Sequence, residues 1–226
     1  FFGKNPGEQQ TVIGALKSGI VGRKSWSEKS RNIDVFDIKS DAIRTLIDLG
    51  LEEKDLHISS STKDCYHPGR SGSINLKSKQ GLNLAYFGEL HPAIITNLDF
   101  KEKNIFGLEI FLKNIHEPYK KLRVSKKNYT VSDFQKSERD FAFVVDKNYK
   151  VGDLEILIKS INSDIIKKVI IFDIFEGQNI PEEKKSVAIN VTIQPLNKTL
   201  TEKDLDQISQ KIIDVVKAKI GATIRT

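Results

Sequence analysis

The segment Ser186-Val-Ala-Ile-Asn-Val-Thr-Ile193 alternates bulky apolar side chains with small or polar ones at every step. A period of two is typical of a β-strand that buries one face and exposes the other. Its β-branched residues also favour a strand over a helix. We therefore expect a core on the side of Val187, Ile189, Val191 and Ile193, and an uncovered face on the side of Ser186, Ala188, Asn190 and Thr192.

The patterns around this strand predict a β-α-β-β-α-β order. The other elements are strands at 139–146, 169–175 and 222–226, with helices at 152–162 and after Thr201. Thr201, with Asp204 three residues on, is close to a capping box, and Gly221 is expected to end that helix. The first helix is expected to bury Leu154, Ile156, Leu157 and Ile161. This order is that of the ferredoxin-like split βαβ fold.

In such a fold both helices cover one face of the sheet and leave the other face open. Period-two counting along 169–175 places Asp173 and Phe175 on one side. The opposite side is the more apolar one and is expected to face the helices; it holds Ile170, Phe172 and Ile174. Asp173 and Phe175 are therefore predicted to lie on the open face.

Ser186 and Ala142, on the neighbouring strands, are predicted to share that open face. An aromatic ring, a carboxylate, a hydroxyl and a small residue form a suitable cradle for one unstacked RNA base, because the ring stacks and the polar groups read the base edge. The alternative is that Phe175 packs under a loop or against a partner subunit.

The preceding part of the chain predicts a second α+β domain over residues 1–118. Val35–Ile38 is interpreted as a strand end, followed by a helix that Ser40 caps and Gly50 ends. Strands at 73–76, 82–87 and 105–112, with a turn at Gly81, predict a largely antiparallel sheet. Residues 119–131 are polar and basic, which is typical of a linker, and 132–226 form the ferredoxin-like domain.

Composition excludes several classes of protein. The 226 residues include 36 Lys plus Arg, 30 Asp plus Glu, one Cys and no Met, for a net charge of +6. The positive excess is too small and evenly spread to indicate binding to polyanions by charge alone. No run of about 18 apolar residues predicts a membrane span. The single Cys65 fits a reducing compartment such as the cytoplasm, and the missing Met leads us to expect a piece of a longer chain.

Residues with reactive side chains are few. His67-Pro68 and His91-Pro92 lie near Cys65 in sequence, but the spacing of a metal site is absent. Ser71 and Cys65 lack a nucleophile elbow and an evident base. Phosphate-binding glycine motifs are also absent. We therefore predict no catalytic site, no metal site and no bound cofactor in these residues.

Several strings resemble the beta subunit of bacterial phenylalanyl-tRNA synthetase, in order and spacing, over essentially the whole chain. Five resemble its C-terminal ferredoxin-fold anticodon-binding domain: Ser132–Phe134, Arg139–Asp146, Ile171–Gly177, Ile180–Ser186 and Lys198–Glu202. Three resemble the end of its catalytic-like module, an inactive class II synthetase-like antiparallel sheet domain: Val35–Asp41, Tyr66–Gly72 and Phe87–Pro92. The resemblance therefore implies a C-terminal fragment of that subunit.

The resemblance implies partners and cofactors that the residues alone do not. In that family an (αβ)2 heterotetramer uses ATP and Mg2+ to attach phenylalanine to tRNA(Phe), and the alpha subunit holds the catalytic site. The beta-subunit magnesium ligands belong to regions before Phe1. His67, Arg70, Glu89 and His91 are then expected to be architectural, or to line the interface with the alpha subunit.

The resemblance also assigns the anticodon-binding residues. In relatives the first anticodon base is held at the positions of Ala142, Asp173, Phe175 and Ser186, the four taken independently from the open face. Many relatives have tyrosine at Phe175, so a contact through that hydroxyl would be missing. Two alternatives stay open: a stand-alone RNA- or protein-binding module, and an independent enzyme that uses the His67 and His91 loops.

Overall fold

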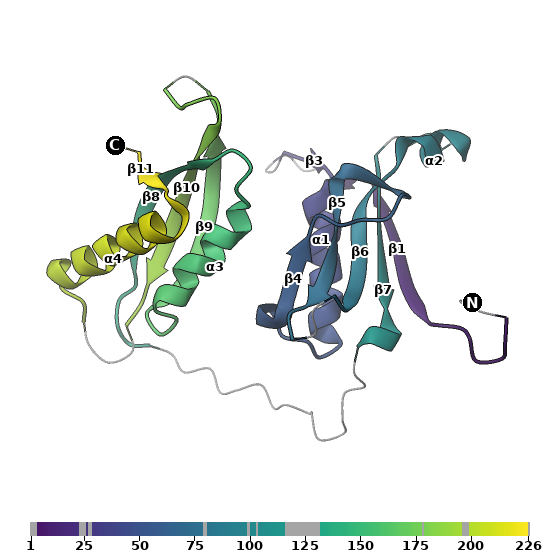
Figure 1. Ribbon diagram of the computed structural model, residues 1–226, viewed down its shortest axis with the longest axis horizontal. Helices are drawn as coiled ribbons and strands as arrows, with labels where there is room; N and C mark the ends of the chain where they lie inside the picture. Colours follow the sequence, from purple (N-terminus) through teal and green to yellow (C-terminus); the bar gives the residue numbers. More distant parts are fainter. Residues whose placement is uncertain are drawn as a thin grey trace. The chain divides into compact units, whose positions relative to one another are not determined.

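The computed structural model describes residues 4–22, 26, 29–78, 81–98, 100–102, 104–115, 132–177, 179–195 and 199–225. The chain divides into two compact units, residues 1–125 and 126–226 (Figure 1). The basic linker predicted at 119–131 lies outside the described residues. Both units combine helices with antiparallel sheets, which confirms the predicted α+β class. None of the helices that the structure describes is long and apolar enough to cross a membrane.

The first unit is built on a five-stranded antiparallel sheet in the order β1-β7-β6-β5-β4. Helix α1 (Val35–Asp48) lies along one face of it (Figure 1). The strands are β1 (Val12–Ser18), β4 (Leu56–Ser59), β5 (Tyr66–Leu76), β6 (Asn83–Leu90) and β7 (Ile105–Phe111). Smaller elements are β2 (Ile20–Val21), β3 (Arg31–Asn32), helix α2 (Pro92–Asn97) and 3-10 turns at Glu53–Asp55 and Leu112–Asn114.

The core of this unit forms where α1 meets the sheet. Ile38, Ala42 and Leu46 are spaced four residues apart, so they lie on one side of the helix, and all are buried. They belong to one apolar cluster with Ile74 of β5 and Ile110 of β7. Burial of these apolar side chains makes the main favourable contribution to the free energy of packing α1 on the sheet.

Two sequence-based expectations for this unit were wrong. Val35–Ile38 is the first turn of α1, and the helix is capped by Asp34, not Ser40. The Asp34 side chain accepts hydrogen bonds from the N–H groups of Phe36 and Asp37, and the Asp37 carboxylate accepts from the Asp34 N–H at 2.9 Å. Arg31 pairs with Asp37 at 2.7 Å and lowers the pKa of that carboxyl. Strand β1 was not predicted, because its apolar and polar residues do not alternate.

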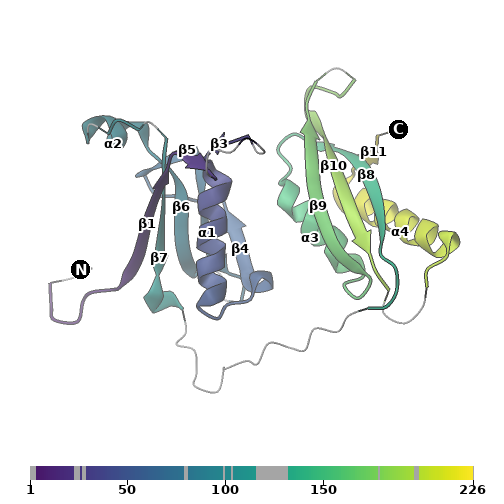
Figure 2. The same ribbon diagram turned by 180° about the vertical axis from the view of Figure 1, so that it is seen from behind.

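The second unit has the predicted β-α-β-β-α-β order. Its strands are β8 (Ser137–Asp146), β9 (Ile166–Phe175), β10 (Lys184–Ile193) and β11 (Thr223–Ile224), in the sheet order β11-β8-β10-β9. Helices α3 (Val151–Ile161) and α4 (Glu202–Ile220) cover the same face of the sheet, since both pack into one core with β10 (Figure 1). Figure 2 shows the other face of β8, β10 and β9 in front, with the helices behind.

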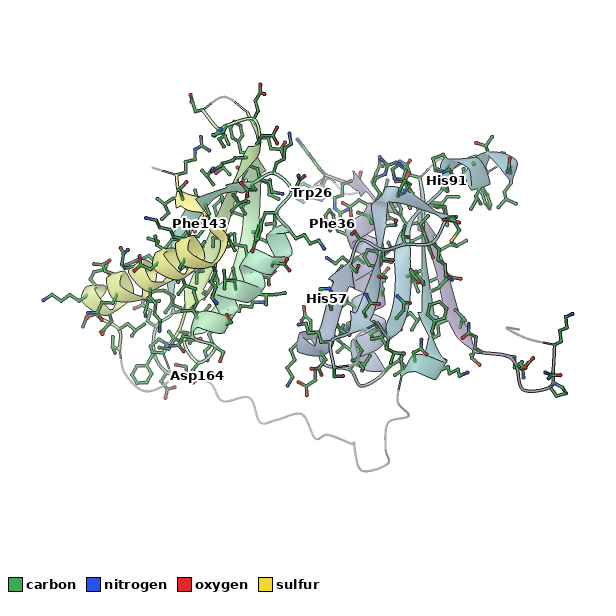
Figure 3. All side chains as sticks on the ribbon, in the orientation of Figure 1. Trp26, Phe36, His57, His91, Phe143 and Asp164 are labelled. Atoms are coloured by element: carbon green, nitrogen blue, oxygen red, sulfur yellow. The ribbon has the colours of Figure 1, made fainter. Side chains whose placement is uncertain are left out.

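Strand β10 supplies the centre of the core. Val187, Ile189, Val191 and Ile193 are completely buried, as their alternation predicts. Phe143 of β8, labelled in Figure 3, is opposite Val187 and is 1% exposed. Helix α4 begins with a full capping box between Thr201 and Asp204 and ends at Gly221, whose φ of 66° is left-handed. In α3, Ile158 is buried and Ile156 is 54% exposed, which corrects the predicted apolar stripe.

Strand β9 contains an irregularity that overturns part of the face assignment. Asp173 is opposite Ala188 and Ile171 is opposite Ile189, so β9 has one extra residue, Phe172, in between. This β-bulge reverses the alternation of the strand. Ile170 lies opposite Asn190 on the open face, although it was expected to face the helices, and Ile171 packs into the core instead.

A close backbone approach in the first unit gives a testable prediction. Gly88 has φ of +156°, and a Cβ there would come within 2.7 Å of the Ser71 Cα. Gly88→Ala should lower the free energy of unfolding by roughly 2–3 kcal/mol, because backbone must shift. Gly14→Ala is the control, since a Cβ at Gly14 meets nothing within 4 Å. Chemical denaturation of the two variants measures the difference; equal stabilities would contradict the steric account.

Candidate functional site

The four predicted base-binding residues lie on the open face of the second unit. Phe175 of β9 is directly opposite Ser186 of β10. In the next row, Ala188 of β10 is opposite both Asp173 of β9 and Ala142 of β8. Residues directly opposite one another in antiparallel strands share a face, and successive rows are about 7 Å apart. The register thus brings all four side chains into two adjacent rows, here called the cradle.

Phe175 provides the apolar surface of the cradle. The residue is 39% exposed, which is high for a phenylalanine. The guanidinium carbon of Arg225 lies over the ring, 5.3 Å from its centre. Gly177 borders the ring closely, because a Cβ there would come within 3.1 Å of the ring carbon Cζ.

The polar members of the cradle differ in accessibility. Ser186 is 3% exposed, whereas Asp173 is exposed to solvent. A carboxylate accepts hydrogen bonds and donates none, while a serine hydroxyl can do both. The exposed Phe175 ring can stack a planar heterocycle, and the exposed Asp173 carboxylate beside it can accept hydrogen bonds from donors on the edge of that heterocycle.

Two residues of this site were not found by sequence reasoning. Arg225 reaches the cradle because its N–H donates to the Ala142 carbonyl at 2.8 Å, next to the pairing of Thr223 with Val144. Gly177 lies near the ring because it follows Phe175, the last residue of β9, by two residues. A strand at 222–226 was predicted, but its register against β8 was not, so no pattern in the sequence pointed to Arg225.

The two histidines expected in loops, His67 and His91, have local structural roles, and His67 in fact lies within β5. The Nδ1 atom of His67 accepts a hydrogen bond from the Gly69 N–H at 3.0 Å. His91, labelled in Figure 3, lies at the N-terminus of α2, where its Nδ1 accepts from the Ala93 N–H at 3.3 Å. Each ring therefore helps to fix the backbone two residues after it.

Other reactive groups of the first unit are also engaged. The Arg70 guanidinium forms two hydrogen bonds with the buried Glu89 carboxylate, and this contact raises the pKa of Arg70. Burial raises the pKa of the Cys65 thiol, which keeps it protonated at neutral pH and weakens it as a nucleophile. The Ser71 hydroxyl donates to the His67 carbonyl. Within the described ranges, no three His, Cys, Asp or Glu side chains come together as a metal site.

Family models match both units. Residues 132–225 match the ferredoxin-fold anticodon binding domain. Residues 2–112 match the phenylalanyl tRNA synthetase beta chain CLM domain. The two matches together cover most of the described chain.

Individual relatives are similar over nearly all of the chain. The phenylalanine–tRNA ligase beta subunit of Bartonella henselae is 40% identical over 225 residues, which are 97% of this chain and 28% of that protein. The corresponding subunit of Mesorhizobium japonicum is 36% identical over 99% of this chain. That of Rickettsia prowazekii is 34% identical over 96% of it. The chain thus spans 28% of the length of its Bartonella henselae relative.

The exposure of Phe175 predicts that its role is separable from folding. Phe175→Ala should lower the free energy of unfolding by about 1 kcal/mol, because much of the ring is already in water. Phe143→Ala should cost about 3–5 kcal/mol, since it leaves a cavity in the core. Chemical denaturation of the 226-residue chain compares them. A loss at Phe175 as large as that at Phe143 would show that the ring is a core residue.

Proposed function

Because the chain belongs to the family of phenylalanine–tRNA ligase beta subunits, we propose that its second unit binds the anticodon of tRNA(Phe). The observation that carries this proposal is the cradle: Ala142, Asp173, Phe175 and Ser186 meet on the sheet face opposite to the one that α3 and α4 cover. The similarity extends through both units to subunits of one ligase, which favours this function over a stand-alone binding module.

The cradle suits a single unstacked base. The Phe175 ring provides a stacking surface, and stacking on an aromatic side chain contributes roughly 1–3 kcal/mol per base. Asp173, as an acceptor, favours a base with N–H donors on its edge. The small Ala142 side chain leaves room above the sheet between these groups. Relatives with tyrosine at the position of Phe175 would add a contact through the hydroxyl group, which this chain lacks.

We propose that the first unit organises the complete enzyme. It would contact the alpha subunit in an (αβ)2 heterotetramer, and that subunit would carry out the ATP- and Mg2+-dependent attachment of phenylalanine in the cytoplasm. The local hydrogen bonds of His67 and His91, and the pairing of Arg70 with Glu89, support an architectural role for these loops. A catalytic role for the two histidines finds no support in this geometry.

The central test is the affinity of the complete αβ enzyme for tRNA(Phe). Phe175→Ala should weaken binding by roughly 1–3 kcal/mol, because the stacked base loses its platform. Phe175→Tyr should retain it. Phe36→Ala serves as the control, since Phe36 is an exposed phenylalanine of α1 in the other unit. Filter binding or fluorescence titration measures the affinities, and an unchanged affinity of folded Phe175→Ala enzyme would refute the cradle.

Replacing the first anticodon base of tRNA(Phe) gives an independent check. The wild-type enzyme should bind the altered tRNA more weakly than the natural one. Phe175→Ala enzyme should discriminate less between the two, because the base contact is already lost. Equal discrimination by both enzymes would show that the base is read elsewhere.

A further inference from the structure

Arg225 is attached to the cradle through its backbone. Strand β11 pairs with β8 at Thr223 and Ile224, and the Arg225 N–H continues this pairing by donating to the carbonyl of Ala142. Ala142 is itself a cradle residue. The base of the Arg225 side chain is thus held beside the cradle on the β8 side.

The head of the same side chain reaches the opposite side of the cradle. β11 and β9 are the two edge strands of the sheet, with β8 and β10 between them. The guanidinium nevertheless lies over the Phe175 ring on β9. Arg225 therefore extends across the open face, and its guanidinium lies over the ring on which a base would stack.

The charge of Arg225 lacks a carboxylate partner in the described part of the chain. The other arginine of this unit, Arg139, does have such a partner, since it contacts Glu202 at 2.8 Å. The Arg225 guanidinium instead lies over a neutral ring. A cation over an exposed ring is a weak interaction, whereas a guanidinium and a phosphate form a planar, two-point hydrogen-bonded pair.

We propose that Arg225 is a fifth tRNA-binding residue, which holds the backbone phosphate of the nucleotide whose base stacks on Phe175. This inference rests on the proposed anticodon function and assigns it a residue beyond the four cradle positions. The base takes the place of the guanidinium on the ring, and the released guanidinium binds the phosphate of that same nucleotide. In the absence of RNA, the guanidinium stays over the ring, which is still partly exposed.

The test is the salt dependence of tRNA(Phe) binding to the complete αβ enzyme. Loss of one phosphate contact in a single-stranded region should reduce the slope of log affinity against log salt by about 0.7. Arg225→Ala should show that reduction, together with a roughly three- to tenfold weaker affinity at low salt. Arg225→Lys should keep the slope. Lys211→Ala removes one charge from an exposed position of α4, and α4 covers the other face of the sheet, so its slope should not change.

A modified tRNA locates the contact. With a neutral methylphosphonate at the phosphate of the first anticodon nucleotide, wild-type and Arg225→Ala enzymes should bind equally well. Arg225→Gln, which keeps much of the side-chain length, repeats the comparison and guards against a folding defect in the alanine variant. If the wild-type advantage persisted with the neutral phosphate, the proposed contact would be wrong.

The failure of this inference is distinguishable from that of the anticodon function. If Phe175→Ala weakens binding and Arg225→Ala leaves both affinity and slope unchanged, the cradle stands and the role of Arg225 is refuted. Tighter binding by Arg225→Ala would also refute it, because the guanidinium would then act only as a competitor for the ring. If neither substitution has an effect, the anticodon function itself is refuted.

Discussion

The burial of one face of β10 is the constraint on which the second unit depends. Four apolar side chains at alternate positions, Val187 to Ile193, are removed completely from water against the helices. Because a strand alternates its side chains, this burial leaves Ser186 and Ala188 on the opposite face. The antiparallel register then places residues of β8 and β9 in the same rows. The position of the cradle is thus a geometric consequence of how the core is made.

Much of this fold can be predicted because its strongest signals are local. The alternation in β10 and the Thr201 capping box are both legible in short stretches of sequence, and the structure contains both. The start of α1 was misread because Val35–Ile38 is as apolar as a strand end, while the true cap, Asp34, precedes it. Asp34 forms a capping box with Asp37, which also pairs with Arg31, and the choice of Ser40 as a single preferred N-cap residue overlooked this arrangement.

The candidate site shows where local patterns stop being sufficient. Asp173 and Phe175 lie beyond the bulge, between it and the end of β9, so simple alternation places them on the open face. The same counting fails at Ile170, on the other side of Phe172, because an extra residue in one strand is defined only by its partner strand. Arg225 is subject to the same limit, since its place depends on how β11 pairs with β8, a contact between segments far apart in sequence.

The brevity of β11 couples the stability of this edge of the sheet to ligand affinity. A strand of two residues, paired with a single neighbour, is among the segments that open at the lowest free energy. A ligand that needs this strand in place binds only the closed fraction of molecules, so its apparent dissociation constant is the intrinsic one divided by that fraction. Substitutions that tighten β11 on β8 without touching the ligand would therefore raise affinity by preorganisation. The stability of this edge of the sheet thus sets the apparent affinity of the open face for its ligand.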